Sequence, residues 1–250
     1  MSDNDQDFPL TKTIQMLLDR IEPGTIFAAA SHLPGSYSNF TYLVEAHDRN
    51  GATLRFVFRR YAVFGHYDQT LKAIREFKTY ELIRQYGLSA PQPLYLDKSG
   101  EFLGAPGIVT TFMPGDQMMF PIEPILWAQT MARTLAQIHA ISGLATAPDF
   151  LLDAGQEAAW FIRDATPPTF METHPLGRMV WQTVHKRFFS LLPTPPTLIH
   201  MDYWPGNILW QEKQISAVVD WEEASWGDPA IDVAYCRMNM LIDGLDEAAH

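Results

Sequence analysis

The chain has 250 residues, with 18 Lys plus Arg and 29 Asp plus Glu, so its formal net charge at pH 7 is −11. This acidic balance argues against nucleic acid and anionic membranes as main partners, because both attract basic protein surface. Hydrophobic residues make up 47% of the chain, as in folded rather than disordered proteins. With no apolar run long enough to span a membrane, no signal-peptide pattern and only Cys236, we expect a cytoplasmic protein without an internal disulfide.

The negative charge is concentrated in the last fifth of the chain. Residues 201–250 carry ten acidic and two basic residues, which account for −8 of the −11. Such a concentration indicates either a solvated acidic face or a site for a cation. The motifs in the same segment have to decide between these two interpretations.

The first part of the chain predicts strands around one long helix. In order, the expected elements are a helix at 12–21, strands at 37–46 and 53–60, a helix from Asp68 to Tyr86, and strands at 94–96 and 107–112. In the second strand, a period of two places Val57 and Arg59 on the face opposite Phe58. Glu76 lies one turn before Tyr80 on a partly apolar helix face, which is unusual for a carboxylate without a partner.

The second part of the chain predicts mainly helices. Met113-Pro114-Gly115 interrupts the strand pattern, and helical periodicity follows at 125–141 and 178–192. This segregation predicts an α+β fold of two lobes, residues 1–112 and 113–250, joined by a hinge near 110–115. Two lobes joined by a hinge commonly bind a ligand between them.

Three polar residues in the acidic segment form a set with a definite chemistry. Asp202 and Asn207 precede an expected hairpin of strands 208–210 and 215–219, and Asp220 follows it. The hairpin would bring Asn207 and Asp220 together, and their oxygens are the ligand type that Mg²⁺ prefers. A carboxylate at Asp202 could accept the proton of a substrate hydroxyl. The four residues between Asp202 and Asn207, with an aspartate at the end of the following strand, are the spacing of a kinase catalytic loop.

A longer run of motifs carries a family resemblance. It comprises His200-Met201-Asp202 through Asn207, then Asp220-Trp221-Glu222, and Gly227-Asp228-Pro229 followed by Asp232. The run resembles the aminoglycoside phosphotransferase and choline kinase-like family, which are small-molecule kinases with a protein-kinase-like fold. Met201 stands where glycine is usual in that family, which changes a linker position and leaves the chemical groups intact.

The first half of the chain resembles the same family. Gly35, Ser36 and Asn39 match its nucleotide loop, Arg59 its phosphate-binding base, Glu76 the helix glutamate that pairs with that base, and Thr110 and Phe112 its adenine-binding hinge. The resemblance implies a bilobal fold with an antiparallel-sheet lobe containing one main helix, followed by a mostly helical lobe. It also implies ATP, with GTP as the alternative, and Mg²⁺ as the metal.

The resemblance assigns roles to individual residues. Asp202 would orient the substrate hydroxyl and accept its proton, and Asn207 and Asp220 would hold Mg²⁺. Asp232 would fix the catalytic loop, and His200 would support that loop rather than act as a base. The expected partner is a small hydroxylated molecule, cationic if the acidity serves its binding, and the oligomeric state is open. Family members usually continue for several helices beyond the last motif, so we expect an abbreviated or truncated acceptor lobe here.

Other interpretations of the same residues stay open at this point. Singly, Asp202, Asn207 and Asp220 could be turn and cap residues, and Arg59 and Glu76 could be solvated. Glu222 and Glu223 are equally compatible with surface acids and with a contact to a cationic substrate. The whole chain could be a nucleotide-binding regulator without turnover. A protein kinase proper is disfavoured, because no A-P-E motif follows the metal aspartate.

Overall fold

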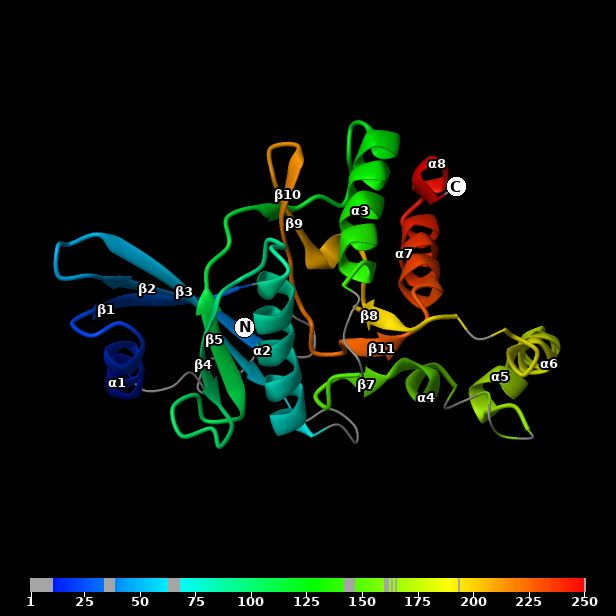
Figure 1. The fold of residues 1–250 in the computed structure, drawn as a ribbon, viewed down its shortest axis with the longest axis horizontal. Coiled ribbons are helices and arrows are strands. Elements are labelled where there is room, and N and C mark those ends of the chain that lie inside the picture. The colour runs from blue at the N-terminus through cyan, green and yellow to red at the C-terminus, as the bar shows by residue number, and fades with distance from the viewer. Residues whose placement is uncertain are drawn as a thin grey trace.

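The computed structural model describes residues 11–33, 39–62, 68–141, 147–159, 162, 164, 166–192 and 194–249. It has a β-rich part and a helix-rich part along one long axis (Figure 1). The helices are α1 (Thr11–Ile21), α2 (Gln69–Gln85), α3 (Pro124–His139), α4 (Ala154–Ala159), α5 (Thr169–Thr173), α6 (Gly177–Phe188), a 3₁₀ turn (Pro205–Asn207), α7 (Ala230–Ile242) and α8 (Asp246–Ala249). The strands are β1 (Ile26–His32), β2 (Asn39–His47), β3 (Thr53–Tyr61), β4 (Pro93–Asp97), β5 (Gly107–Thr111), β6 (Asp116–Gln117), β7 (Leu152–Asp153), β8 (Thr197–Ile199), β9 (Ile208–Gln211), β10 (Gln214–Val218) and β11 (Ser225–Gly227).

The β-rich part is an antiparallel sheet in the order β1-β2-β3-β5-β4. Phe56 and Phe58 of β3 share a buried cluster with Leu17 of α1. Val57 and Arg59 alternate with them and line a cleft instead. The period of two therefore separates an apolar face, covered by α1, from a face that is free for chemistry.

Helix α2 begins and ends at the predicted signals. The Asp68 side chain accepts hydrogen bonds from the backbone N–H groups of Thr70 and Leu71, which is the geometry of an N-cap. Gly87 follows the helix with φ +77°, a left-handed conformation that ends helices readily. Glu76 and Tyr80 are both buried on this helix. The prediction of a carboxylate on a buried helix face is confirmed.

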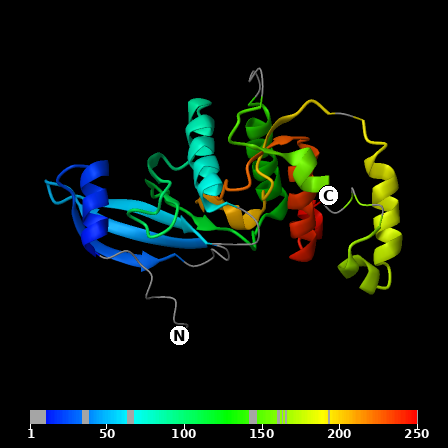
Figure 2. The same ribbon diagram turned by 90° about the horizontal axis from the view of Figure 1, so that it is seen from below.

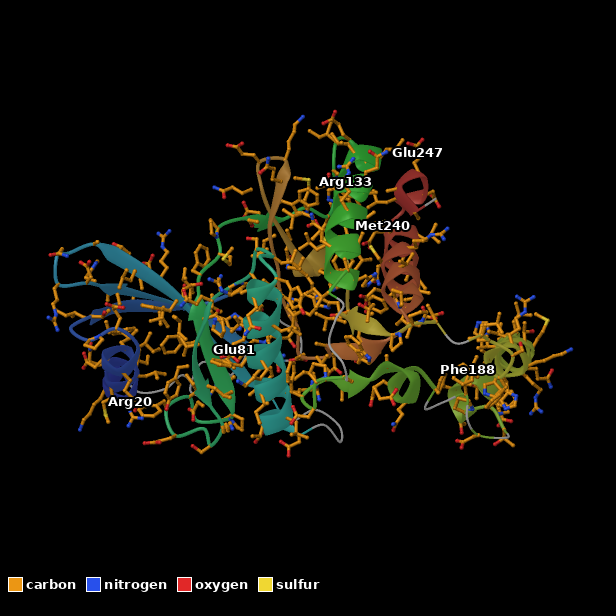
Figure 3. All side chains as sticks on the ribbon, in the orientation of Figure 1. Arg20, Glu81, Arg133, Phe188, Met240 and Glu247 are labelled. Atoms are coloured by element: carbon orange, nitrogen blue, oxygen red, sulfur yellow. The ribbon has the colours of Figure 1, made fainter. Side chains whose placement is uncertain are left out.

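The helix-rich part is built around two small sheets, β10-β9-β6 and β7-β11-β8. Trp221 and Ile208 are buried in one continuous core with Met131 of α3 and Met240 of α7. Helices α5 and α6 contact each other and lie at the far end of the long axis from α1, as Figure 2 shows from a second direction. In Figure 3, Glu81 marks α2, Arg133 marks α3 and Met240 marks α7.

The α+β prediction is confirmed, and the differences concern β1 and several very short elements. The sequence patterns did not indicate β1, because its Ala28-Ala29-Ala30 run has low strand propensity. They also missed β6, β7, β8 and β11, which have two or three residues each. Gly244, with φ +75°, separates α7 from α8, so the C-terminal segment is not one helix. Among the described residues, no helix has the length and apolar character needed to cross a membrane.

The cap of α2 gives a first testable prediction. Asp68→Ala should lower the free energy of unfolding by about 1 kcal/mol, because two backbone N–H groups lose their acceptor. Chemical denaturation measures this change. Asp68→Asn is the matched control, since its amide oxygen can still accept, and equal losses in the two variants would contradict the capping role.

Candidate active site

Two of the predicted metal ligands meet at the base of the β9–β10 hairpin. Asn207 directly precedes β9, and Asp220 lies two residues beyond β10. The N–H of Val219 donates to the carbonyl of Asn207 at 2.9 Å, which closes the hairpin between them. Asn207 and Asp220 consequently line the same cleft. The structure thus brings these two residues together, as the hairpin predicted.

Asp202 is joined to this pair through Asn207. The Nδ2 atom of Asn207 donates to Oδ2 of Asp202 at 2.8 Å and to its carbonyl oxygen at 2.9 Å. The amide nitrogen is thereby directed at Asp202, which leaves the amide oxygen as the atom available to a ligand. Asp202 itself is half-buried and lies outside the residues that line the cleft.

The loop that carries Asp202 is fixed by the fully buried Asp232 of α7. Its two carboxylate oxygens accept from the backbone N–H groups of His200 and Met201, each at 2.8 Å. Nε2 of His139 lies 2.9 Å from the same carboxylate. His200 is bonded on both ring nitrogens: Nδ1 accepts from the Asp202 N–H at 3.3 Å, so Nε2 carries the proton toward the carbonyl of Val219 at 2.9 Å. This ring bridges the loop and the hairpin and has no nitrogen left for a base.

Met201 explains why glycine is usual at its position in the resembling family. Its φ is +68°, in the left-handed region that side chains with a Cβ atom disfavour by about 1–2 kcal/mol. Asp220 has φ +69°, and aspartate tolerates this conformation better. These two left-handed residues are therefore Asp220 itself and the residue before Asp202. The hydrogen bond from the N–H of Met201 to Asp232 stabilises the left-handed backbone of Met201.

Arg59 lies among three carboxylates that come from distant segments. Its side chain pairs with Asp220, with Glu76 of α2 at 3.4 Å from Nε, and with Glu222 at 3.2 Å from Nη2. Arg59 is 8% exposed and Glu76 is 1% exposed, so both are buried rather than solvated. Burial alone would lower the pKa of Arg59, but Asp220 and then Glu76 outweigh it and hold the guanidinium charged.

Glu76 is the most strongly perturbed carboxyl group in this cluster. Its pKa is raised from 4.5 to about 7. Burial is the main cause, Arg59 acts in the opposite direction, and the Asp220 carboxylate adds to the rise. The hydroxyl group of Tyr61 donates to its Oε2, and the hydroxyl group of Tyr80 donates to its Oε1. Near neutral pH, Glu76 is therefore present both as a buried neutral acid and as a carboxylate paired with Arg59.

The cleft between the two parts has a volume of about 400 Å³ and mixed walls. Apolar side chains of both parts form its interior, namely Leu33, Val57, Ile108, Leu209 and Val219. Its polar end has Arg59, Glu76, Asn207 and Asp220. Another wall is formed by the end of β5 and the residues that follow it, namely Thr110, Thr111, Phe112 and Met113. Apolar walls with a few convergent polar groups are typical of small-molecule sites.

Most, but not all, of the predicted site residues meet in this cleft. Arg59, Glu76, Thr110, Phe112, Asn207 and Asp220 line it. Asn39 is buried instead, and its amide donates to Glu222 at 2.6 Å. Gly35 and Ser36 lie outside the described residues.

The sequence interpretation of Glu222 needs correction. It is neither a surface acid nor free for a cationic substrate, because it is 7% exposed and bonded to cations of the protein itself. Besides Arg59, it contacts Nζ of Lys72 at 3.0 Å, and Arg75 donates to its carbonyl oxygen. Lys72, Arg75, Glu76 and Tyr80 form a buried polar stripe at helical spacing on α2, which was a sequence signal for this network.

The donor set suits a magnesium ion. Asn207 offers its amide oxygen and Asp220 its carboxylate, both hard oxygen ligands that face the cleft. Glu76, Asp220 and Glu222 also lie with one oxygen each within 4.8 Å of one another. Arg59 already pairs with all three of these carboxylates, so this second group describes an arginine site as much as a metal site.

The raised pKa of Glu76 predicts a pH dependence of stability. Between about pH 4.5 and pH 7 the folded protein binds more protons at this group than the unfolded chain, so its contribution to stability falls as pH rises. The unfolding free energy of the wild type minus that of Glu76→Gln should therefore decrease by roughly 2–3 kcal/mol from pH 5 to pH 8. Urea denaturation at both pH values measures it. Glu81→Gln on the same helix is the control, because Glu81 is only partly buried. An equal change of unfolding free energy with pH in wild type and Glu76→Gln would refute the assignment.

Solved structures share this fold. A protein from Ralstonia eutropha, provisionally described as an aminoglycoside phosphotransferase, superimposes with a TM-score of 0.68 at 18% identity, covering 96% of this chain and 75% of that one. The macrolide 2'-phosphotransferase MphH from Brachybacterium faecium gives 0.64 at 17% identity, covering 95% and 82%. The gentamicin complex of APH(2'')-IIa gives 0.64 at 13% identity, covering 99% and 84%.

Sequence comparisons extend the assignment from fold to family. Acyl-CoA dehydrogenase family member 10 of Mus musculus is 25% identical over 91% of this chain, which spans only 22% of that longer protein. The profile of the family described as "Phosphotransferase enzyme family" matches residues 30–249. Because this match covers most of the sequence, the chain belongs to the phosphotransferase enzyme family, with the bilobal kinase-like fold that its motifs predicted.

Proposed function

We propose that the chain transfers the γ-phosphoryl group of ATP, or alternatively of GTP, to a hydroxyl group of a small molecule. The observation that carries this proposal is that Asn207 and Asp220 meet at the polar end of a two-sided cleft, while the side chain of Asn207 is hydrogen-bonded to Asp202. Family membership supports phosphoryl transfer in general. In solved relatives, ATP is bound by APH(2'')-IIa and AMP-PNP by an amicoumacin kinase, which supports a nucleotide as the donor.

The cleft divides naturally into a base end and a phosphate end. We assign residues 1–112 to a nucleotide-binding lobe and 113–250 to a catalytic and acceptor lobe. The apolar walls from Val57 and Leu209 suit the two faces of a purine, and the backbone at Thr110–Met113 would meet its edge. Arg59, oriented by Glu76, would contact the phosphates, and its planar guanidinium can bind two oxygens at once.

Asp202 is the group we assign to the acceptor hydroxyl. Its Oδ2 already accepts from Asn207, so the carboxylate is oriented before substrate arrives. It would accept the hydroxyl proton as the bond from the acceptor oxygen to the γ-phosphorus forms and the bond from that phosphorus to the β-phosphate oxygen breaks, which releases the nucleoside diphosphate. Asn207 and Asp220 would hold Mg²⁺, which when bound neutralises charge on the phosphates. Catalysis would thus depend on positioning and electrostatics, since this reaction requires little covalent chemistry from the protein.

The proposed acceptor is a hydroxylated small molecule that carries positive charge. The segment 201–250 has a strong excess of acids, and Asp202 and Asp228 lie in or beside the catalytic motifs. Such a field would favour a cationic ligand near the hydroxyl. Structures of two relatives, one with gentamicin and one with hygromycin B, support a polyhydroxylated acceptor.

Asp202→Ala tests the proposal directly. Turnover should fall by about two orders of magnitude or more, because the proton acceptor is lost, whereas binding of Mg-nucleotide should persist. Turnover is measured by nucleotide consumption across amines, sugars, amino alcohols and antibiotics, and binding by isothermal titration calorimetry.

The exposed Glu101→Ala serves as the control for this substitution and should retain wild-type turnover. Unchanged turnover in Asp202→Ala would refute the assignment of Asp202. A wild type that binds Mg-nucleotide but transfers phosphate to no acceptor would indicate a regulator rather than an enzyme.

A further inference from the structure

We propose that a metal ion binds at this site by replacing Arg59 as the partner of Asp220. The guanidinium of Arg59 leaves Asp220 and stays paired with Glu222. This inference rests on the proposed function, because it concerns the same Mg²⁺ site. It assigns Glu222 as a positioning residue: it acts on the metal site through Arg59 rather than by touching the metal or the nucleotide.

The geometry of one nitrogen atom carries the argument. Nη2 of Arg59 contacts a carboxylate oxygen of Asp220 and, at 3.2 Å, Oε2 of Glu222. The same nitrogen is therefore shared between a carboxylate assigned to the metal and one that is not. While Arg59 pairs with Asp220, its positive charge lies against Oδ1, one of the two oxygens with which Asp220 could bind a divalent cation, and repels that cation.

The two carboxylates differ in how firmly they are held. Glu222 has a nearly buried side chain and is fixed by Asn39 at 2.6 Å and Lys72 at 3.0 Å, which come from β2 and α2. The side chain of Asp220 is 25% exposed and faces the cleft. In the described part of the chain, no side chain other than Arg59 pairs with Asp220. Asp220 is therefore the partner that can be given up, and Glu222 is the fixed one.

Electrostatics explains why a second carboxylate is needed. A buried guanidinium that lost its only partner would be strongly destabilised. Because Glu222 and Glu76 keep their contacts to Arg59, Asp220 can turn to a metal ion without leaving a buried charge uncompensated. The charge of Arg59 also stays at the polar end of the cleft, where phosphates would meet it.

Glu222→Gln should make the exchange unfavourable. Without the competing carboxylate, Nη2 of Arg59 pairs more tightly with Asp220, and a divalent cation has to displace it. Binding of Mn²⁺ alone, measured by electron paramagnetic resonance without nucleotide, should weaken roughly tenfold. Glu223→Gln is the matched control: it removes the same charge one residue away, where the side chain contacts Lys72 at 3.3 Å and no atom of Arg59, and should weaken Mn²⁺ binding far less.

A double-mutant cycle with Arg59→Met separates positioning from direct ligation. If Glu222 acts through Arg59, its substitution should change Mn²⁺ binding in the Arg59→Met background no more than Glu223→Gln does. A full tenfold loss in that background would overturn the proposal and make Glu222 a metal ligand. Equal losses in Glu222→Gln and Glu223→Gln would also overturn it.

Two measurements keep the outcome interpretable. Thermal unfolding identifies a variant that fails to fold, and Glu222→Asp then replaces Glu222→Gln: it keeps the charge but shortens the reach to Arg59, and should also weaken Mn²⁺ binding. Unchanged binding in Glu222→Asp would count against the exchange. Mn²⁺ binding is measured without turnover, so the two proposals can fail separately. If the variants change Mn²⁺ binding as expected but the wild type transfers no phosphate, only the proposed function is refuted.

Discussion

One buried cation, Arg59, determines how the two parts of this molecule fit together. An ion inside a protein is stable only if its charge is matched by nearby groups. The matching carboxylates come from α2 and from the segment after β10, so the sheet, the helix and the β9–β10 hairpin must all be in place for Arg59 to be paired. The interaction that places a positive charge in the cleft is thus also a contact that joins the two parts.

A second buried polar group, the carboxyl group of Asp232, fixes the loop that carries Asp202. Residues 200–204 have no helix or strand of their own, and Met201 has a left-handed backbone. Asp232 supplies what regular structure would otherwise provide, because it accepts from two successive backbone N–H groups of the loop. Asp232 lies in the first turn of α7, so the loop's conformation depends on the docking of that helix.

The sequence was informative where function depends on local pattern. The hairpin between Asn207 and Asp220 follows from strand periodicity, and the alternation along β3 correctly separated Arg59 from the apolar face. The contacts of Glu222 could not be derived in this way, since the three partners of its side chain come from β2, β3 and α2, at sequence distances of 150 residues or more. Periodicity shows which face a residue occupies and cannot show which distant face it meets.

The arrangement also links stability to function at the centre of the site. Three carboxylate oxygens within 4.8 Å of one another would repel strongly without a cation between them, and in this structure Arg59 is the cation that pairs with all three. Removing Arg59 would therefore change the protonation of its neighbours as well as the proposed contact with phosphates. The buried Glu76, with a pKa of about 7, is the group best able to take up a proton in response. A loss of activity on replacing Arg59 therefore combines these two effects. Substitutions of Glu76 and Glu222 are more informative, because they change where the guanidinium of Arg59 lies and leave its positive charge in the protein.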